Sequence, residues 1–480
     1  MNSYKLPTQG ATAEHIFTAL QSFKSQDVPW ATGRAFAYVY EPPADAKEVI
    51  SQAFVQYLSE NVLDPTSFPS VLKMERDVIS MVANVLGGDA QTVGNITAGG
   101  TESIMLALKA ARDYFKANKN ATVTPEVILA STAHAAFFKA CHYLGLKPVL
   151  VPVNTQTFQI ETDKIAPLIN ENTAIIVASA PNYSHGVADD VVAMGQVAKQ
   201  HNIFLHVDAC VGGFYLPFAR RNGANIAAFS LEVEGVTSIS CDLHKYGYTF
   251  KSVSVILYKS ALLRQYQIYT CSDWAGYSLV NPTVASSKSG ASLAGAWACL
   301  HYLGEAGYLN LNKITQGATA EFINGVKNIP ALEVLGEPVM NLVAVASRNP
   351  VVSVFKLADM LKQKGWYVQT QLASSISPET LHLNINPANA EWVADLVKDL
   401  HQAVLELLEI NQSLPIFDVE WIEKTLGAPD GIAQIFQLFG SDGGSLPDDF
   451  VLINNFLNQL SPNLRNLLLT YFANNLFVAP

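Results

Sequence analysis

One lysine of this 480-residue chain stands where lysines are rarely found. Residues 235–241 (GVTSISC) are apolar and β-branched, which predicts a strand that enters the interior, and Lys245 follows within residues 242–248 (DLHKYGY). Because an ammonium is strongly hydrated, lysine is almost never fully buried unless it is paired. At the end of a buried strand its pKa would fall, and the neutral amine could attack a carbonyl and form a Schiff base. The alternative is a lysine whose stem reaches back to water.

A second motif has the form of an anion site. Gly100 and Thr101 lie in residues 97–103 (TAGGTES), directly before the helical periodicity of residues 103–116. A helix N-terminus offers backbone N–H groups and the positive end of the helix dipole, and the threonine adds a hydroxyl, so together they suit a phosphate. The alternative is an ordinary cap, in which Thr101 or Ser103 accepts a hydrogen bond from the first-turn amides.

A carboxylate and an imidazole follow two further predicted strands. Asp208 ends the apolar run 203–208 (IFLHVD), where an unpaired charge costs on the order of several kcal/mol. A protonated pyridine nitrogen would be a suitable partner, and its proton would make the ring an electron sink. His134 follows the run 127–131, where its ring could stack on an aromatic cofactor. For both residues the alternative is a cap on the turn or helix that follows.

Alternating patterns along the chain predict the elements that must position these motifs. Short apolar runs are typical of buried strands, and the amphipathic segments between them are typical of helices. Asp189 is placed to cap the predicted helix 189–200. Such alternation predicts an α/β fold with a mostly parallel sheet and helices on both faces. Ligands of open sheets bind beyond the carboxyl ends of the strands, where all four motifs lie. The predicted strands are 127–131, 148–153, 174–179, 203–208, 235–241 and 252–258, and the predicted helices are 135–144 and 189–200.

The chain divides into four predicted segments. Residues 1–60 form an N-terminal segment, 61–290 the large domain that carries the motifs above, 291–412 a smaller α+β domain, and 413–480 a helical C-terminal extension whose role stays open. Further helices are predicted at 47–59, 72–86, 289–303, 391–408 and 464–477, further strands at 331–335, 351–355 and 380–385, and a loop at 440–445.

Composition excludes several classes of function. A net charge of −11 and the lack of a long Lys or Arg run argue against a nucleic-acid partner. The five cysteines, odd in number and without CxxC spacing, predict reduced thiols and no metal site. The N-terminus lacks the apolar run of a signal peptide, and no apolar run reaches the ~18 residues of a membrane span. We therefore expect a cytoplasmic protein without a membrane span.

These motifs resemble those of pyridoxal-phosphate (PLP) enzymes of fold type I in the group II decarboxylase family, and among them most closely those of the sphingosine-1-phosphate lyases. The resemblance spans roughly residues 30–310 and includes 33–40, 61–69, 181–186 and 274–290. It implies pyridoxal 5'-phosphate as the cofactor, a PLP-dependent transferase-like fold with a seven-stranded sheet, and a homodimer with shared active sites. The low content of charged residues, 15%, fits a large apolar contact between subunits.

The resemblance also implies a role for each motif. Lys245 would form the Schiff base with the cofactor, Asp208 would pair with its pyridine nitrogen, and His134 would stack on its ring. The cofactor phosphate would be held by Gly100 and Thr101, with His244 beside it. Lys251 and Tyr40 match a lysine and a tyrosine that the lyases keep near the substrate.

Two departures from the resemblance bear on the substrate. Asp64 stands where the lyases carry a histidine thought to help hold the substrate phosphate, and a carboxylate there would repel a dianion. Lys288 lies just before Gly290, where the family has an arginine, and a lysine cannot make the bidentate fork to an anion. An unphosphorylated amino acid or amine, including a cationic one that Asp64 could meet, is therefore the rival to a phosphorylated long-chain amine.

The predicted chemistry is that of a PLP-dependent carbon–carbon lyase acting on an amine. Loss of carbon dioxide would make it an amino-acid decarboxylase and loss of an aldehyde an aldehyde-lyase, and the cofactor anchors serve both. Tyr40, Lys251 or His185 could be the acid–base group, their alternatives being a buried aromatic, a solvated lysine and a loop histidine. We expect Tyr40 or the loop 286–288 to reach the partner's site. A catalytically silent protein with a binding or assembly role is the alternative from another class, and the intact Lys245 argues against it.

Overall fold

A seven-stranded sheet dominates the computed structural model, which describes residues 6–28, 30–428, 430–440 and 449–478. Its strand order is β1-β7-β6-β5-β4-β2-β3; β7 runs antiparallel to β1 and β6, and the other neighbours pair in parallel. The mostly parallel sheet is therefore confirmed. The strands are β1 Val93–Thr97, β2 Glu126–Ala130, β3 Lys147–Val151, β4 Thr173–Ser179, β5 Phe204–Asp208, β6 Val236–Asp242 and β7 Ser254–Tyr258.

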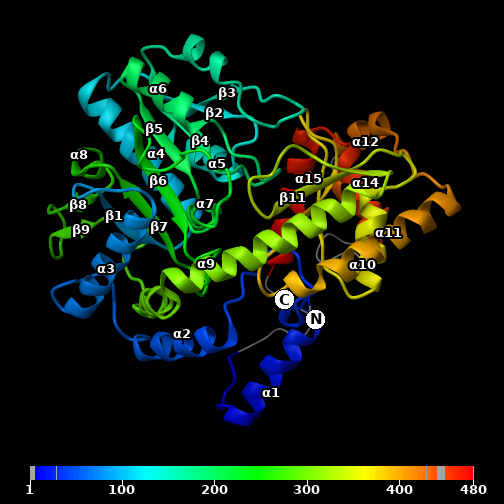
Figure 1. Cartoon of the computed structure of the whole chain (residues 1–480), viewed down its shortest axis with the longest axis horizontal. Coiled ribbons are helices and arrows are strands. Elements are labelled where there is room, and N and C mark those ends of the chain that lie inside the picture. The colour runs from blue at the N-terminus through cyan, green and yellow to red at the C-terminus, as the bar shows by residue number, and fades with distance from the viewer. Residues whose placement is uncertain (1–5, 29, 429, 441–448, 479–480) are drawn as a thin grey trace.

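Helices cover both faces of this sheet, as predicted (Figure 1). Side chains alternate along each strand, so Ile175 and Val177 of β4 join an apolar cluster with α4 and α5, whereas Ile176 and Ala178 join the cluster of the opposite face. That second cluster includes side chains of α3, α6, α7 and α9. The helices are α3 Pro69–Val85, α4 Gly100–Asn118, α5 Ala135–Leu144, α6 Val191–His201, α7 Leu216–Arg221, α8 Ala261–Arg264 and α9 Ala291–Lys327.

A smaller antiparallel sheet, in the order β10-β11-β13-β12, lies at the far end of α9, which is kinked at Gly304 (Figure 1). Its apolar cluster packs against α10 and α11. Predicted strands at 331–335 and 380–385 are confirmed, but the strand at 351–355 is wrong. That run holds the two residues before the cap of α10, the N-cap Ser353, whose hydroxyl accepts from Phe355 N–H, and the buried first two residues of the helix. The elements are β10 Leu332–Val334, β11 Leu342–Ser347, β12 Gln369–Gln371, β13 Thr380–Asn384, α10 Val354–Gln363 and α11 Val393–Ile410.

The chain ends in a C-terminal helical unit of four helices, α12 to α15, with an apolar cluster of its own around Ile435 and Phe456. Its helices are α12 Val419–Leu426, α13 Gly431–Gln437, α14 Phe450–Gln459 and α15 Pro462–Leu476. The loop predicted at 440–445 lies, beyond Gly440, outside the described residues. The boundaries of the four predicted segments stay a prediction.

The remaining elements are two helices near the N-terminus, a short hairpin and several 3-10 turns. Helix α1 projects from the rest of the molecule (Figure 1), and α2 packs on α9. These elements are α1 Ala13–Phe23, α2 Ala44–Gln56, the hairpin of β8 Tyr269–Cys271 and β9 Leu279–Asn281, and 3-10 turns at Lys24–Gln26, Trp30–Thr32, Thr162–Lys164, Ala166–Leu168 and Ala390–Trp392. Within the described part of the chain, no helix combines the length and apolar composition needed to cross a bilayer.

The cap predicted for α6 is off by one residue. Asp190, not Asp189, accepts the hydrogen bond from Ala193 N–H. Asp189 is buried instead, and its carboxylate accepts from the backbone N–H groups of Ser179 and Ile160 at 2.8 and 3.1 Å. Burial raises the pKa of Asp189 to about 6, because the charged form is poorly solvated there. This carboxylate fixes the turn that leaves β4 and leads to residues 181–186.

Gly186, in that turn, offers a test of how tightly the two sheets are joined. Its φ is +68°, and a Cβ there would clash with the carbonyl oxygen of Leu342 in β11. Gly186→Ala should lower the free energy of unfolding by about 2–5 kcal/mol, since left-handed strain adds about 1–2 kcal/mol and overpacking about 1–3 kcal/mol. Gly145→Ala is the matched control, because its φ is +62° but open space surrounds the added carbon. Equal losses for the two variants in urea unfolding would contradict the close contact.

Candidate active site

A cavity of about 640 Å³ opens at the carboxyl edge of the large sheet, beyond β1, β2, β4, β5 and β6. The parallel strands end at one edge, so the motifs that follow them meet there. Most of the predicted site residues line the cavity, namely Gly100, Thr101, His134, Asp208, His244, Lys245 and Lys251. The other two, Tyr40 and His185, lie behind its wall.

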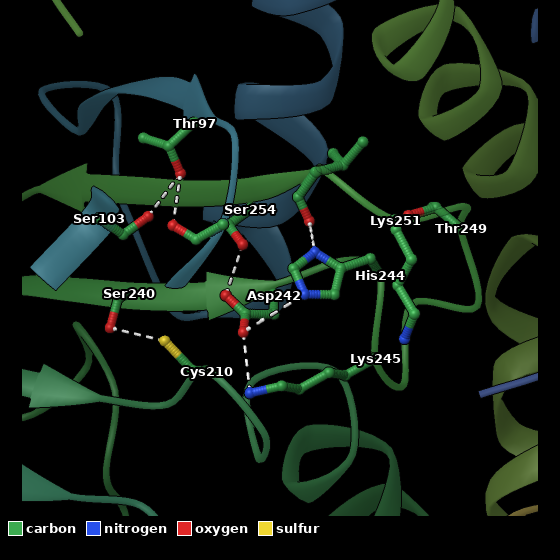
Figure 2. Close-up of polar contacts among 12 residues, drawn as sticks. Thr97, Ser103, Cys210, Ser240, Asp242, His244, Lys245, Thr249, Lys251 and Ser254 are labelled. Atoms are coloured by element: carbon green, nitrogen blue, oxygen red, sulfur yellow. Dashed lines mark hydrogen bonds and ion pairs between the residues drawn. The ribbon is translucent and has the colours of Figure 1, made fainter. Parts of the chain in front are cut away.

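Lys245 is paired with a buried carboxylate that was not predicted. Its Nζ lies 2.8 Å from Asp242 Oδ2, and Asp242 Oδ1 accepts from the Ser254 hydroxyl at 2.5 Å (Figure 2). Burial lowers the pKa of Lys245, but the charge of Asp242, its hydrogen bond and the nearby Cys210 and Tyr40 together more than reverse this, so the pKa stands above its ordinary value. The predicted fall in pKa is therefore wrong. The largest contribution that raises the pKa comes from Asp242, the last residue of β6, three residues before the lysine.

The same carboxylate holds the residue beside the lysine. His244 Nδ1 donates to the carbonyl oxygen of Val253 at 2.7 Å, and Nε2 lies 3.8 Å from Asp242 Oδ2 (Figure 2). Burial lowers the pKa of His244 against the opposing pull of Asp242. The charges of Lys245 and His244 lower the pKa of Asp242 despite its own burial. Asp242 therefore stays ionised in the resting enzyme and orients both neighbours.

The N-terminus of α4 forms a cradle that suits a phosphate. Its N-cap is Gly99, which has no side chain to accept from the first-turn amides, and Ser103 bonds the Thr97 hydroxyl at 2.7 Å instead. A Cβ on Gly100 would lie 2.8 Å from the Asp242 carboxylate and from Cys210 Sγ, so this position has room for glycine only. Ser103 therefore does not cap the helix, and the first-turn amides face the cavity with the helix dipole behind them.

Asp208 is fixed at the end of β5 by two donors. Its Oδ1 accepts from Cys210 N–H at 3.0 Å and from the Ser240 hydroxyl at 3.5 Å. Behind it, His206 hydrogen-bonds the hydroxyls of Ser238 and Ser240, and burial lowers the pKa of this imidazole to about 4. A neutral, hydrogen-bonded histidine thus supports a carboxylate that lines the cavity, which suits a cationic ring nitrogen as a ligand.

His134 fits both interpretations given to it from the sequence. Its Nδ1 accepts from Ala136 N–H at 3.2 Å, so it caps α5 and carries its proton on Nε2. Its exposed ring also lines the cavity. The ring of Tyr183 meets it edge-on, with centroids 6.1 Å apart. The cap therefore sets the orientation of a ring that is available to stack on a cofactor.

Lys251 lies on a strained loop at the cavity. Tyr248 and Ser252 have φ values of +57° and +72°, which are unfavourable for residues other than glycine. Lys251 Nζ donates to the carbonyl oxygen of Tyr38 at 2.9 Å and lies 5.1 Å from the ring centre of Tyr40. The pKa of Lys251 is lowered mainly by burial and to a smaller extent by the charge of Lys245.

Tyr40 and His185 support the wall of the cavity from behind. Tyr40 is buried against Tyr246, and burial raises its pKa. His185 stacks on Phe158 at 3.8 Å between ring centres, and its Nε2 hydrogen-bonds the Ser377 hydroxyl at 3.1 Å. Burial lowers the pKa of His185 to about 4, so its imidazole is neutral near neutral pH. Their predicted acid–base roles stay predictions.

The two residues that bear on the substrate are both engaged in local contacts. Asp64 is exposed and lies outside the described lining of the cavity; its carboxylate accepts from the N–H and hydroxyl of Thr66 and from the Ser67 hydroxyl. These hydrogen bonds lower the pKa of Asp64 to about 2. Lys288 Nζ donates to the Ile96 carbonyl and the Thr283 hydroxyl. Neither charge points into the cavity of its own protomer.

Known proteins resemble this chain over most of its length. Residues 5–348 match the family described as the pyridoxal-dependent decarboxylase conserved domain. The chain belongs to this family. Among its relatives, the sphingosine-1-phosphate lyases of Oryza sativa and Arabidopsis thaliana are 37% and 38% identical over 408 residues, which cover 83% of this chain and 74% and 73% of theirs.

Solved structures agree with this family. A sphingosine-1-phosphate lyase of Burkholderia pseudomallei is 30% identical with a TM-score of 0.79, covering 85% of this chain and 92% of its own. Glutamate decarboxylase of Lactobacillus brevis shares the fold, with a TM-score of 0.75 and 19% identity over 87% of this chain and 97% of its own. The protein is therefore a PLP-dependent lyase of the decarboxylase family, and the alternative of a catalytically silent protein is set aside.

The residues present fit the cofactor of this family. Pyridoxal phosphate, when bound, supplies an aldehyde that condenses with an amine and a ring that withdraws electrons from the bond to be broken. The uncapped first turn of α4 suits its phosphate, and the Asp208 carboxylate suits its protonated ring nitrogen. Asp242 and Tyr183 also line the cavity, and no role had been predicted for either of them. A buried lysine needs a counter-charge, so Asp242 had a signal in the sequence, whereas Tyr183 had none.

Asp242→Asn should lower the pKa of Lys245, because the carboxylate that raises it is lost while the burial that lowers it remains. The neutral amine then forms at lower pH. The measurement is the rate at which the visible band grows after cofactor-free protein meets pyridoxal phosphate, over a range of about pH 7 to 12, which spans the ordinary lysine pKa. The midpoint of this rate profile should shift to lower pH in the variant.

The matched control is Asp113→Asn, which removes a carboxylate paired with Lys109 and Arg112 on α4. Its midpoint should equal that of the wild type, because Asp113 lies outside the described lining of the cavity. A midpoint that stays in place or rises in Asp242→Asn would show that another group sets the protonation of Lys245.

Proposed function

We propose that the enzyme breaks a carbon–carbon bond in a phosphorylated long-chain amino alcohol, such as sphingosine 1-phosphate, and releases an aldehyde. Support comes from the similarity to sphingosine-1-phosphate lyases reported above and from the chemistry of the cavity. Release of an aldehyde requires a base that takes the proton of a substrate hydroxyl, whereas loss of carbon dioxide requires only an acid after the bond has broken. The base therefore distinguishes the two reactions.

Lys251 carries this proposal. It lines the cavity, its Nζ is held by the Tyr38 carbonyl, and partial burial together with the charge of Lys245 lowers its pKa. A lysine with a lowered pKa can be neutral before the reaction and take a proton from a hydroxyl. Tyr40, with its raised pKa, and His185, stacked behind the wall, are less suited to this step. We assign the base to Lys251.

The other residues would bind and orient. Lys245 would bond the cofactor aldehyde as the neutral amine, and Asp242, 2.8 Å away, would stay ionised and keep that amine in place. Asp208 would hold the proton on the ring nitrogen, and His134 would lie against the ring face. The phosphate of the cofactor would take the first-turn amides of α4 at Gly100 and Thr101, with His244 beside it.

Decarboxylation of a free amino acid is the second candidate, and Asp64 favours it. Its carboxylate stays charged at all physiological pH values, since its pKa is lowered to about 2. If a partner subunit brings this residue to the cavity mouth, the charge would repel a phosphorylated substrate and attract a cationic one. Within one protomer the carboxylate is engaged with Thr66 and Ser67, so the first candidate is preferred.

Lys251→Gln should lower kcat for aldehyde release from sphinganine 1-phosphate by about 10²-fold, near the lower end of what general acid–base catalysis contributes. The rise of activity with pH should disappear as well, because the base must be neutral to act. Aldehyde and carbon dioxide are measured side by side, with sphinganine 1-phosphate and a panel of free amino acids as substrates. Carbon dioxide from an amino acid without aldehyde release would instead establish decarboxylation.

Two controls accompany this assay. Lys199→Gln removes a surface lysine that pairs with Glu234, and it should leave kcat unchanged. Lys245→Ala should be colourless in the presence of pyridoxal phosphate, whereas Lys251→Gln should keep the visible band. A Lys251→Gln variant with wild-type kcat and pH profile would remove Lys251 from the reaction.

We further propose that the enzyme is a homodimer with shared active sites. Helix α1 has no buried residue, and one side exposes Ile16, Phe17, Leu20 and Phe23. Val284 is 60% exposed and also lines the cavity, so a partner that covers it would complete the site. Tyr40 is buried within its own protomer, which favours the loop 284–288 over Tyr40 as the segment that reaches across. A cytoplasmic location is part of the proposal, supported by five free cysteines.

The double variant Phe17→Asp with Phe23→Asp should shift the protein from twice the chain mass to the chain mass in light scattering. Two carboxylates on the apolar side of α1 would be desolvated in the dimer and stay hydrated in the monomer. Ile416→Asp is the control, because Ile416 is 92% exposed on the segment before α12. A wild-type protein that elutes at the mass of one chain would contradict the dimer.

A further inference from the structure

Two side chains of the C-terminal helical unit hold the backbone of one residue in the connection between β12 and β13. Asn458 of α14 accepts a hydrogen bond from Ala373 N–H at 2.6 Å, and Arg465 of α15 donates from Nη1 to the Ala373 carbonyl at 3.0 Å. Ala373 lies in the connection between β12 and β13, residues 372–379, which we name the 372–379 loop. Both backbone polar groups of this residue are therefore held by side chains from the end of the chain.

The grip is rigid because Arg465 is fixed on its own side. Its Nε donates to the Leu460 carbonyl at 3.0 Å and its Nη2 to the Asn458 carbonyl at 2.9 Å, so the planar guanidinium joins the α14–α15 turn to the loop. Asn458 Nδ2 also donates to Glu379 at the other end of the loop, at 3.4 Å. The helical unit thus fixes the loop near both of its ends.

The 372–379 loop reaches across to the large sheet. Ile376 packs against the apolar cluster of the large sheet, and the Ser377 hydroxyl hydrogen-bonds His185 Nε2 at 3.1 Å. The two strands that the loop joins contact the same region. Gln369 of β12 accepts from the Tyr183 hydroxyl at 2.8 Å, and His382 Nε2 of β13 donates to the Tyr183 carbonyl at 2.8 Å.

Tyr183 brings these contacts to the cavity. It lines the cavity together with Asn182, and its ring meets the edge of His134. Asn182 is fixed by donating to the Phe158 carbonyl and by accepting from His185 N–H. An unbroken series of packed and hydrogen-bonded groups therefore runs from Arg465 through the loop and Tyr183 to His134.

A purely stabilising role for the helical unit would rest on different contacts. The unit also touches α10, where Lys362 Nζ lies 5.1 Å from the ring centre of Phe450. Helix α14 packs on α10, and Val451 packs against the apolar cluster of the smaller sheet, at residues outside the described lining of the cavity. The clamp on Ala373 differs, because it acts on a loop that hydrogen-bonds His185.

We propose that Asn458 and Arg465 are positioning residues of the active site, which fix the 372–379 loop and through it the wall formed by Tyr183 and His185. The C-terminal helical unit is thereby part of the substrate-binding apparatus. This inference rests on the proposed function only where turnover is measured, since the positions of Tyr183 and His185 can be followed without a substrate.

Arg465→Ala should raise the KM for sphinganine 1-phosphate by roughly 10-fold with little change in kcat, within the range of up to about 10² that a 1 Å misplacement from a distant mutation can cost. The visible band of bound pyridoxal phosphate should persist, because the loop contacts neither Lys245 nor Asp208. Amide hydrogen exchange, measured by mass spectrometry, should accelerate in residues 372–379 and 181–187. Arg465→Lys should restore part of the protection, since it can still donate to the Ala373 carbonyl.

Arg348→Ala is the matched control, because this arginine pairs with Glu333 on the smaller sheet and is mostly exposed. It should leave KM and exchange in 181–187 unchanged. Ser377→Ala cuts the link between the loop and His185 while leaving the clamp intact, so it tests the inference even if Arg465→Ala does not fold. It should accelerate exchange in 181–187 and raise KM.

Three results separate the possible failures. If the wild type turns over no amine, the proposed function fails, and exchange in 181–187 still decides whether the clamp fixes the wall. If exchange in 181–187 is the same in wild type, Arg465→Ala and Ser377→Ala, the positioning role is wrong whatever the activity. A lower melting temperature with unchanged exchange in 181–187 and unchanged KM would assign the unit a stabilising role alone.

Discussion

The buried pair of Lys245 and Asp242 is the interaction on which the site depends. Neither charge would be stable in the interior by itself, because each would lose its hydration, and the pair is stable only with short contacts and further hydrogen bonds. Asp242 therefore needs Ser254 on the neighbouring strand, and β7 has to run antiparallel beside β6 to bring that hydroxyl close. The requirement extends to Gly100, where a side chain would touch the carboxylate. Position and charge state of the reactive amine thus follow from three elements at once.

The cavity has two parts: the strand ends at the edge of the large sheet, and a wall that residues 181–186 form beside them. Strands β1, β2, β4, β5 and β6 end side by side, so the groups that follow them need little further support. Residues 181–186 differ, because they leave the sheet after β4 and lie against the smaller sheet. Gly186 shows how close the contact is, since its backbone lies against Leu342 without room for a side chain. The smaller sheet therefore determines where Tyr183 stands, although it contributes no side chain to the described lining of the cavity.

Features that depend on the local residue pattern were predicted well, and features that depend on where a side chain points in the fold were predicted poorly. Most strands of the large sheet have clear apolar runs, and their ends helped to identify Thr101, His134, Asp208 and Lys245 as neighbours. Strand β1, whose residues 93–97 (VGNIT) include a glycine and an asparagine, was not among the predicted strands. The run at 351–355 was misassigned because a buried helix start and a strand have the same apolar pattern over five residues. Two adjacent aspartates, 189 and 190, cannot be told apart by residue type, and only the fold decides which one caps α6.

The orientation of the side chain also explains why the expectations for Asp64 and Lys288, the two residues that bear on the substrate, differ from their observed contacts. Asp64 was expected to act on a phosphate because of its charge, yet a carboxylate two and three residues before donor side chains closes its own turn at low energetic cost. Lys288 was judged by the fork that it lacks, yet its ammonium serves a carbonyl and a hydroxyl of its own chain. The chemistry of a side chain is read from its type, but its partner depends on groups that are distant in sequence. Tyr183 is the extreme case, because its hydroxyl is satisfied by β12, its carbonyl by β13, and its ring faces a histidine from a third segment. Such a residue has no local signature, and its place in the cavity follows from the docking of the smaller sheet against the larger one.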